Sequence, residues 1–361
     1  MNKKYTTMKI PIYKPYLPKK SIEYAKDAIE SGWISSIGEY LERATKELVK
    51  KTGYKYAILV NNGTSATHLC SRVLKKWHPE IRRIFLPSAC YIAAYNSLLY
   101  DNNEWALQPV DIDVETWNMT IPNCEYGDAI MAVHNLGNII SLKNANCPVI
   151  EDSCETLLAI SKQKKSLCAS ISFFGNKNIT SGEGGAVLTD DEDIFKYVSK
   201  LKGQGQTEKR YIHDELGYNY RMTNIQAALL LGQLEKWDTI YNLKQDLFVK
   251  YNEAFSKYEN IIPQKVELDH SRWMYGVRII GSKSYEENKR LFDSYGIETR
   301  PMFYSFKSHK HLDFLQSTPN EIYENALNLH DEIVILPSYP ELTNEEINLI
   351  TDTTKEIART K

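Results

Sequence analysis

Lys177 lies in the segment SFFGNKNITSGEGG (residues 172–185), between aromatic residues and a run of glycines. Lysine is common on protein surfaces, so the residue alone predicts no function. Its amine can nevertheless form a Schiff base with a carbonyl compound when neighbouring groups keep it reactive. The glycines allow a ligand or another backbone segment to approach closely. The segment is therefore a candidate reactive site if partner groups occur elsewhere in the chain.

A second candidate group is the carboxylate of Asp152 in VIEDSCET (149–156). It follows a segment with the composition of a buried strand, where a carboxylate is costly unless a cation or a hydrogen-bond donor meets it. Open α/β sheets also bind ligands at the carboxyl ends of their strands. A helix N-cap is the alternative role for Asp152, and this stretch alone favours neither. Glu155 would point into the same crevice or into water.

The third candidate is VNNGTSATHL (60–69), which has the pattern of a strand followed by a helix start. Backbone N–H groups at a helix start bind anions, and the hydroxyls of Thr64 and Ser65 can add donors. The simpler interpretation is an Asn-Gly turn with a hydroxyl cap. Taken alone, the stretch favours that simpler interpretation.

One cofactor needs all three groups together. Pyridoxal 5'-phosphate requires a lysine amine for its Schiff base, an acid beside its pyridine nitrogen and a cup for its phosphate. A carboxylate near that nitrogen stabilises the protonated ring, which then withdraws electrons more strongly. The sequence therefore predicts a site for this cofactor, with pyridoxamine 5'-phosphate as its aminated form.

The elements that would position these groups alternate between short apolar runs and helical patterns. Helix-like stretches include residues 65–76 and 91–99. Runs of strand length, rich in β-branched and aromatic residues, occur at 56–60, 83–87, 105–113, 128–134, 147–152, 169–174 and 185–190. This alternation predicts an α/β fold with a mainly parallel sheet covered by helices on both faces.

The pattern changes after residue 224. Residues 224–258 predict one long helix, with one glycine and no proline, that leads from one domain into the next. A strand at 272–280 and helices at 285–295 and 344–358 follow. We therefore expect a large cofactor-binding domain over residues 1–240 and a small α+β domain over residues 241–361.

The composition of the chain limits the classes of partner that it can bind. The 361 residues carry a net charge of −2, which gives no basic surface for nucleic acid or anionic membranes. We find no apolar run of signal-peptide or membrane-spanning length, so a cytoplasmic location is expected. The cysteines form no CxxC pair and no zinc-ligand pattern, which predicts reduced thiols and no metal at Cys70, Cys90, Cys124, Cys147, Cys154 and Cys168.

The motifs, taken in order, resemble those of the DegT/StrS family of sugar-nucleotide aminotransferases, and within it the 4-aminotransferases of the GDP-perosamine synthase type. The similarity runs from IPIYKPYLP (10–18) to LPSYPELTNEEI (336–347) and includes PSACYIAAYN (87–96), EDSCET (151–156) and GYNYRMTNIQAAL (217–229). It implies fold type I of the pyridoxal phosphate-dependent transferases, which has a central mixed sheet, mainly parallel and flanked by helices, with a small C-terminal domain.

The resemblance also implies roles for single residues. Lys177 would form the Schiff base, Asp152 would pair with the pyridine nitrogen, and Tyr91 would stack on the ring, although a core aromatic is the alternative role for Tyr91. Glu155 would lie near the ring hydroxyl. The phosphate cup would be formed by Gly63, Thr64, Ser65 and Ser172.

Asn219 matches an asparagine that reaches the phosphate of the neighbouring subunit, which implies a homodimer with active sites at the interface; a turn or capping role is the alternative. The motifs suggest a sugar-nucleotide pocket lined by Trp33, Ser35, Ser36, Arg300 and His309. Two segments, 137–147 and 158–170, are shorter than is usual in the family and are expected to lack a surface helix and a hairpin.

The implied reaction moves the amino group of L-glutamate to a GDP-, dTDP- or UDP-linked 4-keto-6-deoxyhexose. The product would be a 4-amino-4,6-dideoxyhexose of the perosamine or viosamine type, used in polysaccharides. Freed Lys177 would move the protons. The alternatives are a 3-aminotransferase, a 3-dehydratase, in which histidine replaces the Schiff-base lysine, and a protein that binds the cofactor without catalysis. The presence of Lys177 favours transamination.

Overall fold

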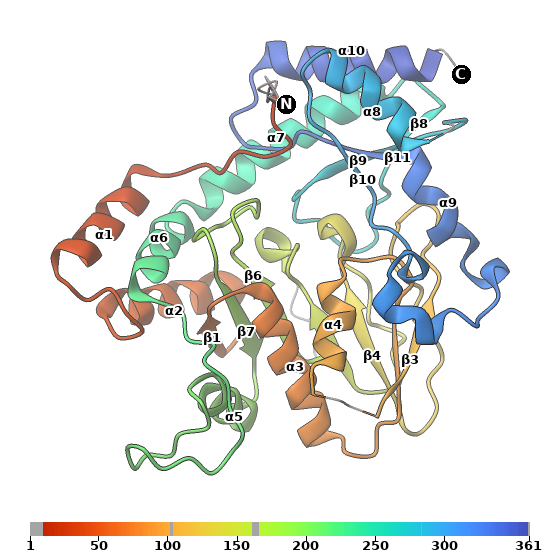
Figure 1. The fold of residues 1–361 in the computed structure, drawn as a ribbon. Coiled ribbons are helices and arrows are strands. Elements are labelled where there is room, and N and C mark those ends of the chain that lie inside the picture. Colours follow the sequence, from red (N-terminus) through yellow and green to blue (C-terminus); the bar gives the residue numbers. More distant parts are fainter. Residues whose placement is uncertain (1–9, 102–103, 161–165, 283, 360–361) are drawn as a thin grey trace, which may run out of the picture.

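The large sheet forms the centre of the computed structural model, which describes residues 10–101, 104–160, 166–282 and 284–359 (Figure 1). Within these ranges the sheet has seven strands in the order β1-β7-β6-β5-β4-β2-β3. Strand β7 runs antiparallel to β1 and β6, and the other pairs are parallel. The strands span Tyr56–Val60 (β1), Arg83–Pro87 (β2), Ala106–Val110 (β3), Asp128–Val133 (β4), Val149–Asp152 (β5), Ser166–Ser172 (β6) and Gly185–Thr189 (β7). The predicted mixed, mainly parallel sheet is confirmed.

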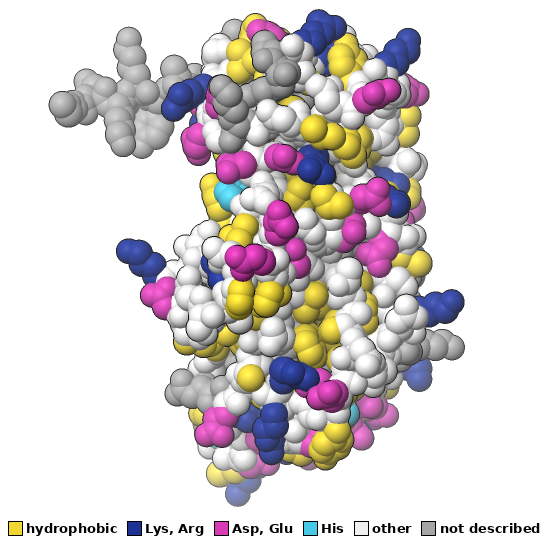
Figure 2. Space-filling view, turned by 90° about the vertical axis from the view of Figure 1, so that its right-hand side faces the viewer, with side chains coloured by type: hydrophobic (Ala, Val, Ile, Leu, Met, Phe, Trp, Pro, Cys, Tyr) yellow, Lys and Arg dark blue, Asp and Glu magenta, His cyan; other side chains and the backbone are white. Residues whose placement is uncertain are grey.

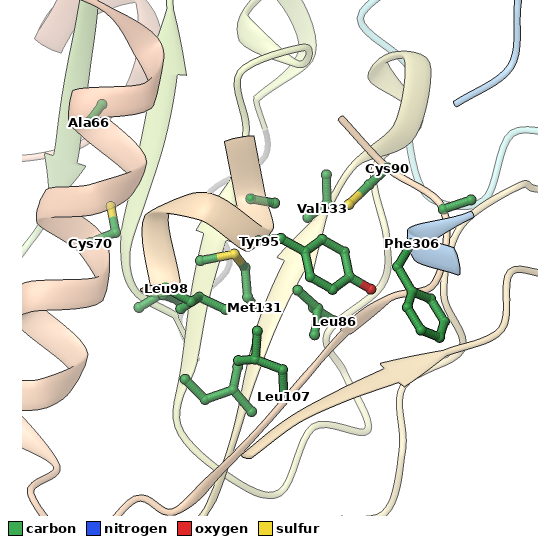
Figure 3. Packing of buried hydrophobic residues seen from close by; sticks show 14 of the residues in the cluster. Ala66, Cys70, Leu86, Cys90, Tyr95, Leu98, Leu107, Met131, Val133 and Phe306 are labelled. Carbon is green, nitrogen blue, oxygen red and sulfur yellow. The ribbon is translucent and has the colours of Figure 1, made fainter. Parts of the chain in front are cut away.

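Helices bury both faces of this sheet, because side chains alternate between the faces along each strand. Ile58 and Val60 join a cluster with α3 (Gly63–Trp77), α4 (Ala93–Leu99) and α5 (Glu192–Lys202). Figure 3 shows part of this cluster, where Tyr95 and Leu98 of α4 lie close to Leu86 and Met131 of the sheet. The opposite face packs against α1 (Lys19–Glu30), α2 (Glu39–Thr52) and α6 (Asn224–Leu234).

A second sheet has the order β10-β11-β9-β8, with all pairs antiparallel. Its strands span Ile261–Pro263 (β8), Tyr275–Ile279 (β9), Arg300–Pro301 (β10) and Ile333–Leu336 (β11). It lies above the large sheet in Figure 1 and shares a core with α7 (Trp237–Phe255), α8 (Tyr285–Ser294) and α10 (Asn344–Arg359). Helix α9 (Glu324–Glu332) packs against β9 and β11, and its buried residues join the cluster that also includes one face of the large sheet. The division near residue 240 stays a prediction.

The single long helix predicted for residues 224–258 is wrong, because the chain turns between α6 and α7. Lys236 leaves the helical conformation at φ −107° and ψ 16°. Glu235 is held at this point by Lys20 and Tyr24 of α1. The buried side chains of α6 pack against α1 and α2. In α7, Trp237 and Ile240 join the same cluster, whereas the apolar residues from Leu247 onward pack against the second sheet. Helix α7 therefore extends from one core into the other.

Residues 272–280 were predicted as one strand, yet β9 begins only at Tyr275. Arg272 has a φ of 57°, which is the left-handed conformation and cannot continue a strand. Several further elements were not singled out by the sequence patterns, because they are short or strongly polar. They are α1, α2, α5, α9, β8, β10, β11 and the 3₁₀ turns Asn135–Gly137, Leu157–Ala159, Phe306–Ser308, Lys310–Leu315 and Asn320–Tyr323.

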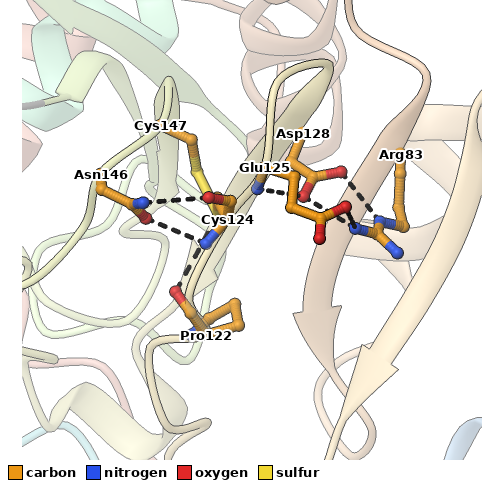
Figure 4. A network of polar contacts seen from close by, with 7 residues as sticks. All are labelled: Arg83, Pro122, Cys124, Glu125, Asp128, Asn146 and Cys147. Carbon is orange, nitrogen blue, oxygen red and sulfur yellow. Dashed lines mark hydrogen bonds and ion pairs between the residues drawn. A yellow bond between two sulfur atoms is a disulfide. The ribbon is translucent and has the colours of Figure 1, made fainter.

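The prediction of six reduced cysteines is wrong for one pair, because Cys124 and Cys147 form a disulfide (Figure 4). Their Cα atoms lie 5.9 Å apart although 23 positions separate them in the sequence. The Asn146 side chain binds both the N–H and the carbonyl of Cys124, and so joins the two segments. The spacing of the cysteines in the sequence could not predict this disulfide, because it depends on how two loops beside β4 meet. The thiols of Cys70, Cys90, Cys154 and Cys168 are free.

The segment expected to lack a surface helix has none among its described residues 138–147. Ile140, Leu142 and Ala145 instead pack directly on Ile130 and its neighbours in the sheet. The second short segment falls partly outside the described residues, at 161–165. Over the face shown in Figure 2, basic and acidic side chains are interspersed, with hydrophobic side chains between them. Within the described ranges, no helix is both long and apolar enough to span a bilayer.

Gly232 allows α6 to touch α1, which yields a testable prediction. A Cβ at this position would lie 2.4 Å from the backbone nitrogen of Ser21. We expect Gly232→Ala to lower the free energy of unfolding by about 1–3 kcal/mol through overpacking, despite the helix-propensity gain of about 1 kcal/mol. Urea denaturation measures the change.

Gly203→Ala is the matched control, because its nearest neighbour would be a carbonyl oxygen at 3.6 Å. The stability of this variant should match the parent. Equal stability of Gly232→Ala and the parent would show that α1 and α6 are not in backbone contact.

Candidate active site

The candidate residues meet at one edge of the large sheet. Asp152 and Ser172 end β5 and β6, and Gly63 begins α3. Parallel strands end at the same edge, so the two strand ends lie side by side. A Cβ on Gly63 would lie 2.7 Å from Cβ of Ser172 and 3.1 Å from Sγ of Cys154. Only glycine permits this close approach of the helix start to the strand ends.

Lys177 lies in the turn between β6 and β7, with its side chain 13% exposed. Its Nζ is 3.6 Å from Oε1 of Glu155 and 3.8 Å from the ring centroid of Trp273. The carboxylate attracts the ammonium by charge, and the ring face attracts it through the π quadrupole. The amine is thus held from two sides.

Glu155 is buried and is itself held in place. Its Oε2 accepts the backbone N–H of Leu136 at 2.8 Å. Leu136 has a φ of 57° within the turn Asn135–Gly137, which aims this N–H at the carboxylate. Burial raises the pKa of Glu155 to about 7, against the opposing charge of Lys177 and with a further increase from Asp152. This carboxyl group can therefore change its protonation state near neutral pH.

The segment Ser271–Trp273 contacts both sides of Lys177. The Nε1–H of Trp273 donates to the carbonyl of Asn176 at 2.8 Å, and Asn178 donates through Nδ2 to the carbonyl of Ser271, also at 2.8 Å. The hydroxyl of Ser271 donates to the carbonyl of Glu155. A single short segment from outside the large sheet thus contacts both the amine and the backbone of the residue that carries its carboxylate.

Asp152 is 7% exposed, and its Oδ1 accepts the N–H of Cys154 at 3.1 Å. Its negative charge also reaches Cys90, where burial raises the thiol pKa and the charges of Asp152 and Glu155 add to that shift. The neighbouring Tyr91 has its side chain 59% exposed and its ring centroid 6.1 Å from that of Phe303. Tyr91 is therefore an exposed aromatic residue that directly follows Cys90 in the chain.

The start of α3 retains donors. The Asn62 side chain caps the helix by accepting the N–H of Ser65 at 2.8 Å. Among the described residues, none accepts the N–H of Gly63 or of Thr64. Together with the hydroxyls of Ser65 and Ser172, these groups suit an anion. No group of three His, Cys, Asp or Glu side chains within the described ranges is arranged as metal ligands.

Comparisons with known proteins agree with this geometry. The sequence profile of the DegT/DnrJ/EryC1/StrS aminotransferase family matches residues 15–355. The chain belongs to this family. The resemblance seen in the motifs is thereby confirmed.

Two relatives in the family are GDP-perosamine synthases. That of Escherichia coli O157:H7 is 34% identical over 96% of this chain and 98% of its own length. That of Caulobacter vibrioides is 35% identical over 82% of this chain and 85% of its own length. A solved structure of E. coli GDP-4-keto-6-deoxy-D-mannose-3-dehydratase with bound hydrated PLP has a TM-score of 0.86 at 20% identity, covering 96% and 99% of the two chains. This similarity confirms the predicted fold.

The residues fit the family's cofactor. The amine of Lys177, the buried carboxylates of Asp152 and Glu155 and the donors at the start of α3 lie at one sheet edge, where Gly63 approaches Ser172 closely. Two residues that hold Lys177 were not predicted from the sequence. Trp273 appeared only as part of a strand, and Tyr13, whose hydroxyl donates to the carbonyl of Lys177 at 3.1 Å, belonged to a motif without an assigned role.

Other predicted residues make no described contact with Lys177. Asn219 is exposed, and its Oδ1 accepts two hydrogen bonds from Arg221. The loop with Trp33, Ser35 and Ser36 is held by Asn224 at the start of α6, through the carbonyls of Trp33 and Ser35.

Two more of these residues come from the later part of the chain. Arg300 is exposed and pairs with Glu298. The pKa of His309 is lowered by burial and by its neighbour His311, which in turn contacts Asn96 of α4. The roles of all these residues in binding stay predictions.

Glu155 predicts a pH-dependent stability. Between its ordinary pKa of 4.5 and about 7, the folded chain keeps a proton that the unfolded chain releases. The stabilisation is present below about pH 4.5 and is lost as the pH rises through 7. We expect the unfolding free energy of the cofactor-free protein, relative to Glu155→Gln, to fall by up to about 3 kcal/mol over this range.

Urea denaturation of both proteins at a series of pH values measures this difference. Because glutamine does not titrate, the variant removes the contribution of Glu155 to the pH dependence of stability. The contributions of the other titratable groups remain. Parallel stability curves for the two proteins would contradict the raised pKa.

Proposed function

We propose that this chain is a pyridoxal phosphate-dependent aminotransferase that converts a nucleotide-linked 4-keto-6-deoxyhexose to a 4-amino-4,6-dideoxyhexose, with L-glutamate as the amino donor. The observation that carries the proposal is the Lys177 amine, held between Glu155 and Trp273 at the sheet edge of a family aminotransferase. Because two relatives at 34% and 35% identity are GDP-perosamine synthases, GDP is the first candidate for the nucleotide.

The cofactor would be held by groups already described. Lys177 would bind its aldehyde, and Asp152 would face its ring nitrogen. The N–H groups of Gly63 and Thr64, with the hydroxyls of Ser65 and Ser172, would bind its phosphate. When bound, pyridoxal phosphate supplies a carbonyl group that takes up the amine and a ring that withdraws electrons from the reacting carbon. The exposed face of Tyr91 would pack on that ring.

Lys177 would then act as the acid and base. Once its amine is free, it can take a proton from the donor carbon and return one to the sugar carbon. Glu155, 3.6 Å away, gives the protonated amine a countercharge when its carboxyl group is ionised. The Trp273 ring covers the amine and limits the access of water, which strengthens these electrostatic interactions.

The proposal includes a homodimer in which Asn219 reaches the partner's phosphate site. Its Oδ1 is occupied by Arg221, so the amide N–H groups are the part left to face outward. An exposed donor of this kind suits a phosphate on a second copy of the chain. Substrate binding by Trp33, Ser35, Ser36, Arg300 and His309 belongs to the same proposal.

The covalent role of Lys177 is tested by borohydride reduction of the holoenzyme. We expect the pyridoxyl group to become attached to Lys177, as detected by peptide mass spectrometry. Lys177→Arg should show no adduct and no absorbance band of the imine, because a guanidinium keeps the charge but cannot form the imine.

Lys202→Arg is the matched control. Lys202, at the end of α5, is a second candidate amine beside the large sheet, since burial and Arg221 lower its pKa to about 8, and its Nζ donates to the carbonyl of Leu59 in β1. This variant should keep the adduct on Lys177. An adduct on Lys202 in the parent protein would contradict the assignment.

The substrate is tested with L-glutamate and GDP-, dTDP- and UDP-linked 4-keto-6-deoxyhexoses, with products identified by NMR. We expect a 4-amino sugar, formed fastest from the GDP-linked compound, because the chain is similar to GDP-perosamine synthases over nearly its whole length. An amino group at carbon 3 would instead identify a 3-aminotransferase. Loss of the oxygen at carbon 3 would identify a dehydratase, and no turnover with any of them would contradict the proposed substrate class.

A further inference from the structure

A pocket of about 80 Å³ lies between α7 and residues 263–276, outside the site described above. Gln245, Phe248 and Asn252 line it from one face of α7, at a spacing close to one and two helical turns. Arg272 and Met274 line it from the facing segment. Their neighbours Ser271 and Trp273 contact Glu155 and Lys177 instead, so this segment borders both the pocket and the active site.

The polar groups of the pocket that still lack a partner are donors. The Oε1 of Gln245 accepts the Nε–H of Arg272 at 2.9 Å, and the Oδ1 of Asn252 accepts the hydroxyl of Tyr275 at 2.6 Å. Both amide oxygens are therefore occupied. Within the described residues, no acceptor meets the amide nitrogens of Gln245 and Asn252 or the terminal guanidinium nitrogens of Arg272.

The remaining polar residues of the pocket satisfy one another. His270 and Gln264 share a hydrogen bond of 3.1 Å between Nε2 and Oε1. The Nδ1 of His270 accepts the backbone N–H of Arg272 at 2.8 Å, which requires a neutral ring. Burial lowers the pKa of His270 to about 3, in agreement with this arrangement. The Nε2 of Gln264 donates to the carbonyls of Thr116 and Asn135.

The charge of the pocket is positive. Its lining contains Arg272 and no Asp or Glu. No carboxylate in the described part of the chain forms an ion pair with Arg272; the charge of Asp269 reaches it, but Asp269 does not line the pocket. Burial lowers the pKa of Arg272, since a partly buried cation without an ion-pair partner is disfavoured. An anion in the pocket would relieve this cost.

The backbone of Arg272 supports a specific role. Its φ of 57° is rare for a residue with a side chain. The conformation brings the guanidinium to the pocket while Ser271 and Trp273 remain in contact with the active site.

We propose that this pocket binds a small oxyanion, of the size of phosphate or a carboxylate group, on Arg272, Gln245 and Asn252. One water molecule needs about 10–15 Å³ of cavity volume. The pocket, at about 80 Å³, therefore has room for such an anion but not for a nucleotide sugar. The site is separate from that of the proposed transamination, so either proposal can fail without the other.

Isothermal titration calorimetry of the holoenzyme tests the site, with inorganic phosphate in one arm and succinate in the other. The cofactor occupies its own phosphate site in this form, and binding that survives in Arg272→Gln is assigned to the proposed sites for L-glutamate and the nucleotide. We expect saturable binding of at least one anion, weakened at least tenfold by Arg272→Gln, because charge-assisted hydrogen bonds are lost. The arm that saturates identifies phosphate or carboxylate as the preferred group.

Two further variants keep the test sharp. Arg278→Gln is the control, since Arg278 lies on the same sheet but pairs with Glu332, and its binding should equal that of the parent. Gln245→Glu places a carboxylate beside Arg272 without truncating the helix face, and should abolish binding. Absence of binding in the parent, or equal binding by the parent, Arg272→Gln and Gln245→Glu, would overturn the proposal.

Discussion

The structure depends on the contact between the segment Ser271–Trp273 and the turn that carries Lys177. The large sheet can place a lysine at the end of β6, but a lysine side chain has four rotatable bonds and would otherwise sample many positions. The contact removes that freedom, because Trp273 binds the carbonyl of Asn176 and covers the amine, while Ser271 binds Asn178 and Glu155. The candidate site is therefore assembled between two parts of the chain.

The site carries an energetic cost that the surrounding fold must offset. Asp152 and Glu155 are buried near each other, and the raised pKa of Glu155 reports the unfavourable removal of its charge from water. Leu136 and Arg272 adopt left-handed backbone conformations on either side of the same region. Buried charge and backbone strain of this kind cluster at functional sites, where the remaining core provides the stability. Here two hydrophobic cores, one on each face of the large sheet, provide it.

The oxyanion pocket and the active site share one short piece of backbone. Arg272 lines the pocket, and its neighbours Ser271 and Trp273 hold Glu155 and Lys177. The fully buried amine of Lys244 binds the carbonyl of Trp273 at 2.8 Å and so joins this segment to α7, the helix that forms the other wall of the pocket. A displacement of the segment Ser271–Trp273 on its pocket side would thus also displace its contacts with Glu155 and Lys177.

The amino-acid sequence by itself determined the α/β fold, the family and the groups that meet at the sheet edge. The alternation of strand-length apolar runs with helical patterns predicts a sheet covered on both faces, and the motifs around Lys177, Asp152 and Gly63 lie at strand ends that a parallel sheet must bring together. Only the tertiary structure decided the break between α6 and α7, the Cys124–Cys147 disulfide, the contact of Trp273 with Lys177 and the turn at Arg272. Each of these features depends on contacts between residues far apart in the sequence. The packing of the two sheets and their helices sets these contacts, so no periodic pattern in the local sequence indicates them.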